Sequence, residues 1–231
     1  MNRFPSTSWE LLAHAARGGD EAAPARGEFA ERYYGAVRAY IAALARGTAS
    51  QTDDLTQRFF EAVVLSGTLL ARADQEKGRF RFYLKQAIRN FLIGEHRQRS
   101  RRTASEVSLD GVTDGWSLVA VDASPSPDEA MMRAWAQSLV AMALSQLERA
   151  CAEKGQREHF EMFMRRYVDD PDRAPSWADV GLPFGLDEKT ARNRTETAAR
   201  RFRSLLRQLI ASDIGAGDDI DGELQAVLAV L

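Results

Sequence analysis

The residues best suited to bind a ligand lie between residues 187 and 207, where basic and polar side chains recur at helical spacing. The candidates that face outward from such a helix are Lys189, Thr190, Arg192, Asn193, Arg194, Thr197, Arg200 and Arg201. Arginine can donate two hydrogen bonds to the edge of a guanine, and asparagine pairs with an adenine in the same way. Threonine and the N-terminus of a helix can hold phosphates. This pattern favours DNA binding over the alternative that the arginines only solvate a helix surface.

A second group of candidates lies between residues 76 and 102, where aromatic and basic residues interleave. The pattern suits melted DNA, because aromatic and guanidinium planes stack on unpaired bases while cations follow the phosphates. The candidates for this contact are Lys77, Arg79, Arg81, Phe82, Tyr83, Gln86, Arg89, Asn90, Ile93 and Arg97. Phe80, Tyr83 and Phe91 recur at core spacing, so burial competes with stacking for these three rings. The row of Phe82, Gln86, Asn90, Ile93 and Arg97 lies on a different face and provides the favoured contacts.

Residues that would support catalysis or metal binding form no comparable pattern in the sequence. The single cysteine, Cys151, excludes a multi-cysteine zinc site, and the three histidines lie far apart without paired ligand spacing. The sequence contains no recognisable pair of catalytic carboxylates, glycine-rich phosphate loop or nucleophile motif. Cys151 itself fits a small apolar core residue. We therefore expect a protein that is not an enzyme and that needs neither a metal nor a cofactor.

Charge is segregated along the chain although the formal net charge is only −2. Residues 76–102 carry nine basic side chains against two acidic ones, and residues 187–207 carry seven against three. Between these blocks, residues 103–132 contain six acids and no lysine or arginine. Two basic helical blocks separated by an acidic stretch indicate two contacts with a polyanion.

The elements that position these residues are predicted to be helices, because no stretch alternates convincingly with period two. We expect helices near residues 9–17, 28–45, 52–66, 80–99, 128–154, 156–168 and 187–211. A short helix capped by Ser176 precedes the last of these, and Gly185 makes the turn between them, which is a helix-turn-helix pattern. The N-terminus lacks the apolar core of a signal peptide, and no apolar run is long enough to span a membrane, so we expect a cytoplasmic protein.

These elements predict an all-α fold of two small helical domains, the second of which ends in the helix-turn-helix. The first domain covers residues 1–102 and the second covers residues 128–211. An acidic flexible linker, residues 103–127, joins them because this stretch is rich in Ser, Asp, Gly and Pro with little periodicity. Residues 212–231 form an acidic tail.

Two motifs in this order resemble those of a known family. The first is Asp53-Asp54-Leu55-Thr56-Gln57-Arg58-Phe59-Phe60, and it is followed by Arg89-Asn90 and the arginine-rich run from residue 97 to residue 102. The second is the helix-turn-helix pattern from residue 176 to residue 207. Together they resemble the extracytoplasmic-function class of bacterial RNA polymerase sigma factors, over roughly residues 9–211.

The resemblance implies a function in transcription initiation and assigns a partner to each surface. The β′ coiled coil of core RNA polymerase would be bound by Asp53, Asp54, Gln57, Arg58 and Glu61. The β flap of the polymerase would be a second point of contact. Residues 73–79 with Tyr83 and Asn90 would hold a flipped base of the −10 promoter element. The helix from Asp187 would read the −35 element. The polymerase carries out the chemistry, and an anti-sigma factor or another regulator is a further partner that the resemblance allows.

The chain departs from the family pattern at three places. Arg58 replaces the usual acid of the docking motif, which predicts lowered or regulated affinity for core polymerase. Gly181, Pro183 and Phe184 interrupt the first helix of the helix-turn-helix. The stretch 147–156 lacks the usual proline-bearing turn, so longer helices are expected there. The tail beyond residue 211 lies outside the family pattern; it either caps its own domain or acts as an autoinhibitory segment.

A second class of function stays open at this point. The chain fits a stand-alone helix-turn-helix transcription regulator, with an N-terminal half that senses a ligand or dimerises. Such a regulator would bind duplex DNA unaided, whereas a sigma factor of this class should bind its promoter poorly without core polymerase.

Overall fold

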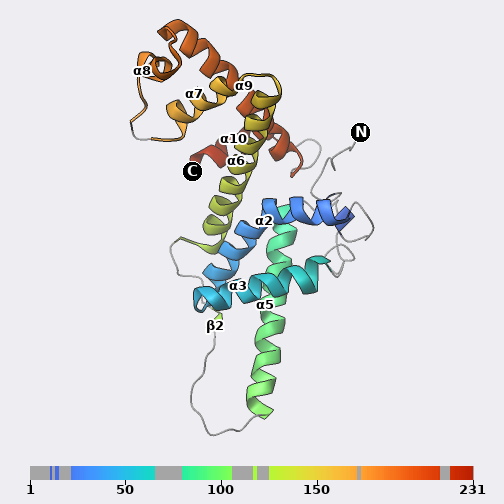
Figure 1. The fold of residues 1–231 in the computed structure, drawn as a ribbon. Coiled ribbons are helices and arrows are strands. Elements are labelled where there is room, and N and C mark those ends of the chain that lie inside the picture. Colours follow the sequence, from blue (N-terminus) through green and yellow to red (C-terminus); the bar gives the residue numbers. More distant parts are fainter. Residues whose placement is uncertain are drawn as a thin grey trace. The chain divides into compact units, whose positions relative to one another are not determined.

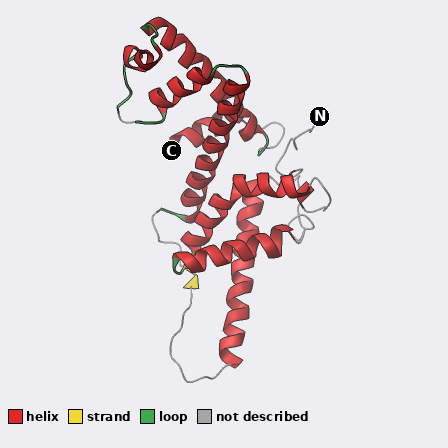
Figure 2. Cartoon of the chain, viewed as in Figure 1, coloured by secondary structure: helices red, strands yellow, loops and turns green. Residues whose placement is uncertain are grey.

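The computed structural model describes residues 11, 14–15, 22–65, 80–105, 117–118, 125–170, 173–213 and 219–230. Nearly all regular structure in these residues is helical (Figures 1 and 2), which confirms the predicted all-α class. The only strands among them are two residues each, β1 (Ala45–Arg46) paired antiparallel with β2 (Ser117–Leu118). No helix within the described ranges is long and apolar enough to cross a membrane.

The helices follow the predicted order. They are α2 (Ala22–Leu44), α3 (Ala49–Phe59) with the π-helical turn η1 (Phe60–Leu65), α5 (Phe80–Ser105), α6 (Pro127–Glu153), α7 (Arg157–Tyr167), α8 (Trp177–Gly181) with the 3-10 turn η3 (Leu182–Phe184), α9 (Glu188–Ala211) and α10 (Ile220–Ala229). The predicted N-terminal helix at 9–17 lies mostly outside the described residues. Most of the predicted linker does too, although α5 extends into it as far as Ser105.

The chain divides into two compact units that do not follow the sequence in simple order. Unit 1 combines Met1–Ser138 with Ala211–Leu231, and unit 2 comprises Leu139–Ile210. The predicted second domain, 128–211, therefore differs from unit 2 at its start, because the first part of α6 groups with unit 1. We call residues 211–231 the return segment. It belongs to unit 1.

The core of unit 1 is built by α2, α3 and α5, with both α3 and α5 packing against α2 (Figure 1). Of the α5 rings predicted at core spacing, Phe80 is fully buried, whereas Tyr83 and Phe91 are half-buried; Leu84, Ile88 and Leu92 complete the fully buried face of the helix. The Phe80 ring lies 6.0 Å from that of Phe29 in an edge-on arrangement, a geometry that aromatic pairs prefer. The periodic apolar face of α5 is thus what fixes which of its side chains remain exposed.

The start of α3 differs from its predicted position because a capping box ends the preceding turn. Thr48 accepts a hydrogen bond from the backbone nitrogen of Gln51 at 3.2 Å, and the Gln51 side chain accepts one from the backbone nitrogen of Thr48 at 2.9 Å. This reciprocal pair satisfies two of the amide groups that a helix start leaves open. The helix therefore begins at Ala49.

A buried carboxylate ties the return segment to unit 1. Asp213 is 4% exposed and accepts hydrogen bonds from Arg32 Nη1 at 3.2 Å, Tyr33 Oη at 2.5 Å and Trp135 Nε1 at 2.8 Å. Burial lowers the pKa of Arg32, but the charges of Asp213 and Glu28 outweigh burial, and the pKa is raised. Arg32 therefore stays charged, and Asp213 joins α2, α6 and the return segment at one point.

Unit 2 has a small apolar core in which Cys151 is fully buried, as expected for an apolar core residue. Leu147, Cys151, Phe163, Ala198 and Ala199 form the main cluster, and Met162, Val180 and Ala191 form a second one. Gly185 adopts the left-handed conformation, with φ of 63°, at the predicted turn before α9. At Gly181 a Cβ atom would lie 2.7 Å from the carbonyl oxygen of Leu186, so α8 and the start of α9 approach as closely as they do only because this residue is glycine.

Replacing Asp213 with alanine should lower the free energy of unfolding by about 3–5 kcal/mol, because the change leaves the buried charge of Arg32 without its main counterion. Urea denaturation followed by circular dichroism would measure the loss. The matched control is Asp53→Ala, which breaks an exposed ion pair with Arg38 and should cost under about 1 kcal/mol. Equal losses in the two variants would contradict the assigned role of Asp213.

Candidate nucleic-acid interface

The acidic edge of unit 1 consists of Asp53, Asp54 and Gln57 on α3 together with Glu61 on η1. All four side chains are exposed, and the opposite side of α3 is buried through Thr52, Leu55, Thr56 and Phe59. Asp53 accepts a charged hydrogen bond from Arg38 at 2.6 Å, and Gln57 donates to Glu61 at 3.0 Å. The amphipathic pattern thus places the predicted docking residues on one outward edge, where a basic partner can reach them.

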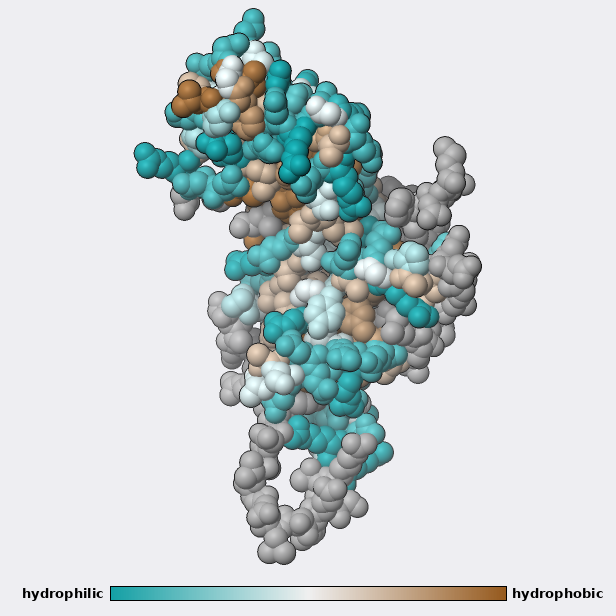
Figure 3. All heavy atoms as spheres, in the orientation of Figure 1, coloured by the Kyte–Doolittle hydropathy of each residue, from teal (hydrophilic) through white to brown (hydrophobic). Residues whose placement is uncertain are grey.

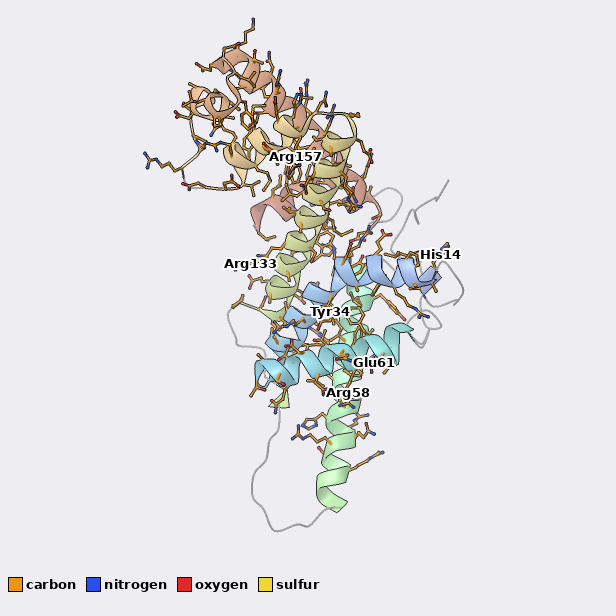
Figure 4. The ribbon with its side chains drawn as sticks, viewed as in Figure 1. His14, Tyr34, Arg58, Glu61, Arg133 and Arg157 are labelled. Carbon is orange, nitrogen blue, oxygen red and sulfur yellow. The ribbon has the colours of Figure 1, made fainter. Side chains whose placement is uncertain are left out.

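Arg58, the residue that departs from the docking motif, is paired within unit 1. Its Nη2 lies 2.5 Å from the Oε2 atom of Glu95 on α5. Figure 4 labels Arg58 on α3 and Glu61 on η1, the turn that directly follows α3. Glu95 offsets the positive charge of Arg58. Arg58 therefore reduces the negative charge of the acidic edge less than the sequence alone indicates.

The predicted DNA-contacting row of α5 is exposed along its whole length. We call Phe82, Gln86, Asn90, Ile93 and Arg97 the α5 face; Phe82 is 61% and Ile93 41% exposed. Gln86 donates a hydrogen bond to the Oδ1 atom of Asn90 at 3.0 Å, which orients both amides on the surface. An exposed phenylalanine followed by two amides on the same face is suited to stack on a base.

The remaining candidates of the second group are placed differently. Lys77 and Arg79 lie outside the described residues, as do the other residues of the predicted base pocket at 73–79. Tyr83 is half-buried, and Arg89 is exposed but donates to the hydroxyl of Tyr40 at 2.7 Å. Burial raises the pKa of Tyr40 even though Arg89 opposes that shift.

Arg81 is the clearest departure from the predicted surface, because its side chain is only 12% exposed. It forms an ion pair with Glu223 of the return segment, and its guanidinium carbon lies 3.9 Å from the centre of the Trp135 ring. Both partners are far from Arg81 in the sequence, and helical periodicity carries no information about such contacts. Arg81 is therefore engaged inside unit 1 and is not available on the α5 face.

A small hollow lies beside Phe82, with a volume of about 130 Å³. Its lining residues are Arg81, Phe82, Lys85, Asp128, Met131 and Met132. Lys85 pairs with Asp128 at 3.1 Å and stands 4.8 Å from the centre of the Phe82 ring. The hollow is smaller than the sites that take drug-sized ligands, which span about 300–1,000 Å³. The sequence alone does not indicate that Lys85, Asp128 and the two methionines are neighbours, because α5 and α6 meet only in the folded unit.

The predicted contact residues of α9 differ in their exposure. Lys189, Arg192, Asn193 and Arg200 are exposed, and we call these four the α9 face. Arg194 pairs with Glu158 of α7 at 2.6 Å, and Arg201 donates to Gln156 at 2.6 Å. The predicted contacts Arg194 and Arg201 thus also hold α9 to neighbouring parts of unit 2.

The two threonines of the α9 prediction serve local structure. Asp187 caps the helix by accepting hydrogen bonds from the backbone nitrogen and the hydroxyl of Thr190, both at 2.9 Å. These hydrogen bonds, led by the backbone one, lower the pKa of Asp187. Thr197 donates to the backbone oxygen of Asn193 at 2.8 Å. Burial is the main cause that lowers the pKa of the nearby His159, and the positive charges of Arg194 and Arg201 lower it further.

Residues beyond the predicted set also lie around the start of α8. Arg166 stands 4.8 Å and Arg192 5.9 Å from the Trp177 ring centre, so two guanidinium groups flank one indole. The surface over α8 shows hydrophobic side chains in an otherwise mostly hydrophilic region (Figure 3), and Leu182 is 77% exposed. Arg166 was visible in the sequence as one of two adjacent arginines, but its stacking on a tryptophan eleven residues later was not.

No protein-family model matches the chain, and no curated protein or solved structure is significantly similar to it. No group of three or more His, Cys, Asp or Glu side chains that could hold a metal ion occurs in the described parts of the chain. Function is therefore inferred from the residues and their geometry.

Replacing Arg192 with alanine should weaken binding to duplex DNA. If Arg192 contacts a guanine edge, the loss should be about 1–3 kcal/mol and confined to one base position. If it contacts a phosphate, the loss should be similar across sequences and the salt dependence should fall by about one charge. Fluorescence anisotropy at several salt concentrations, with the chain bound to core polymerase, would distinguish the two.

The matched control is Arg157→Ala, since Arg157 (labelled in Figure 4) is also exposed and also pairs with a glutamate four residues later. It lies on α7, outside the α9 face. The same loss in both variants would show that Arg192 contributes only general charge.

Proposed function

We propose that this chain is a promoter-recognition subunit of bacterial RNA polymerase, a sigma factor of the extracytoplasmic-function class. The observation that carries the proposal is the pairing of two surfaces in unit 1. An exposed aromatic and amide row on α5 accompanies an outward acidic edge on α3 and η1. The first surface suits unpaired bases and the second suits a basic protein partner, a combination that a factor needs when it opens DNA as part of a larger enzyme.

The α5 face supports binding of single-stranded promoter DNA. Phe82 offers a ring for stacking, and Asn90 can both donate and accept at a base edge. Flipping a base costs a few kcal/mol, which stacking and edge hydrogen bonds must return. The −10 element is the promoter region that this face would hold.

The helices α8 and α9 of unit 2 support reading of duplex DNA. A short helix, a 3-10 turn and Gly185 lead into a long helix whose N-terminal turns carry Lys189, Arg192 and Asn193 on the outside. A helix with such residues at its N-terminal end fits the major groove, and the −35 element is its proposed target. The polymerase β flap is the proposed partner of this unit.

The proposal is tested by co-purification with core polymerase, followed by run-off transcription from fragmented genomic DNA. A sigma factor binds the core enzyme and directs it to specific start sites. A stand-alone regulator would bind duplex DNA without the polymerase and would not support initiation. Promoter-specific transcripts that depend on the added chain support the first function; their absence, with unaided duplex binding, supports the second.

Asp54→Arg should abolish binding to core polymerase and leave the fold intact, because Asp54 is exposed on the acidic edge. A pull-down with purified core enzyme measures the binding, and circular dichroism checks the fold. Asp169→Arg, the same charge reversal at an exposed site of unit 2, is the control and should bind normally. Normal binding by the Asp54 variant would remove this edge from the docking surface.

Asn90→Ala should leave closed-complex binding nearly intact and reduce opening of the promoter, because the variant lacks the amide that holds the unstacked base. Lost permanganate reactivity of unpaired thymines measures the opening. A premelted template should restore transcription. Gln98→Ala removes another exposed amide of α5 and should open the promoter normally. Unchanged opening by the Asn90 variant would mean that its amide is only a surface group.

A further inference from the structure

The return segment contributes two buried carboxylates to unit 1. Asp213 is 4% and Glu223 is 6% exposed. Each is paired with an arginine of another helix, Asp213 with Arg32 of α2 and Glu223 with Arg81 of α5. A buried charge is tolerated only when it is paired, so each acid commits one arginine to the interior of unit 1.

The arginine held by Glu223 is next to the DNA-binding surface proposed above. Arg81 directly precedes Phe82, the first residue of the α5 face, and both line the hollow of about 130 Å³. The Arg81 guanidinium stacks 3.9 Å from the Trp135 ring centre, and its Nη1 atom lies 3.0 Å from the sulfur of Met132. Glu223 supplies the anion in this arrangement. Guanidinium binds carboxylate and phosphate oxygens with the same geometry, so a DNA phosphate is a chemical equivalent of the Glu223 carboxylate.

The two ends of the return segment are held with unequal strength. Asp213 accepts hydrogen bonds from three side chains on two helices, which anchors residues 211–213. The ten-residue helix α10 buries Glu223 and Val227, whereas Leu228 on the same helix is 51% exposed. A helix of this length is not stable in water without packing. Release of Glu223 would therefore unfold α10 while Asp213 keeps the segment attached.

We propose that α10 restrains the α5 face by competition, with Glu223 occupying Arg81 until a backbone phosphate of single-stranded promoter DNA takes its place. The inference rests on the proposed function, because it requires DNA to bind the α5 face. In this inference the return segment regulates DNA binding. Arg81, once released from Glu223, becomes a further contact to a DNA phosphate. The ion pair with Glu223 is buried and little screened by salt, whereas the DNA contact is weakened by salt. The exchange should therefore be favoured at low ionic strength.

Hydrogen exchange on the full chain bound to core polymerase tests the displacement directly. A forked promoter fragment with a duplex −35 region and a single-stranded −10 region is the probe, and fluorescence anisotropy of the same sample reports that the DNA is bound. Amides of α10 should exchange about tenfold faster with DNA than without it, as expected for local unfolding. Amides of α2 should not change. Unchanged or slower exchange in α10 with the DNA bound overturns the inference, and failure to form any DNA complex overturns the proposed function and the inference with it.

Two matched variants test the competition by a second route. Glu223→Gln should raise the affinity for the forked fragment severalfold, because a phosphate then reaches Arg81 without having to displace a carboxylate. Asp221→Asn removes the same charge two residues away at an exposed position and should leave the affinity unchanged. An equal gain in both variants indicates general repulsion between α10 and DNA. Weaker binding by a folded Glu223 variant indicates a purely structural clamp. Either result overturns the inference.

Discussion

The carboxylate of Asp213 is the point on which the arrangement of unit 1 depends. It accepts hydrogen bonds from Arg32, Tyr33 and Trp135, so that two helices and the return segment converge on one buried charge. The Trp135 ring that donates to Asp213 also lies under Arg81, and Arg81 in turn pairs with Glu223. Asp213 and Glu223 thus belong to one continuous set of contacts. Buried polar networks of this kind specify a single packing, because each member is costly when left without its partner.

The apolar core of unit 1 determines which side chains the unit presents to solvent. Burial of Phe80, Leu84, Ile88 and Leu92 fixes the rotation of α5, and this rotation leaves the α5 face in water. Arg81 lies at the border between the buried and exposed sides, and the return segment draws it inward. On α3 the buried stripe likewise leaves the acidic edge outside, while Arg58 is compensated by Glu95 of α5. The two candidate surfaces of unit 1 are therefore consequences of one core.

Periodicity and capping were sufficient to predict most helices and their faces. The core side of α5, the Ser176 cap, the turn at Gly185 and the extent of α9 all follow from local rules that act within a few residues. The capping box at Thr48 and Gln51 was present in the sequence as a Thr-x-x-Gln pattern and was overlooked. The partners of Arg81 and Arg201 were beyond prediction, because a single sequence gives the face on which a side chain lies but not the distant residue that meets it. The contacts that Asp213 makes with Arg32, Tyr33 and Trp135 were beyond prediction for the same reason.

The return of the chain to unit 1 also has a consequence for the order of folding. Unit 2, Leu139–Ile210, is continuous in sequence, so its internal contacts do not depend on a distant segment of the chain. Unit 1 is discontinuous, and Asp213 meets Arg32 across 181 residues. Contacts at such separation require a large loop to close and form slowly. Unit 2 can therefore complete its fold before Asp213 joins α2 to α6 in unit 1.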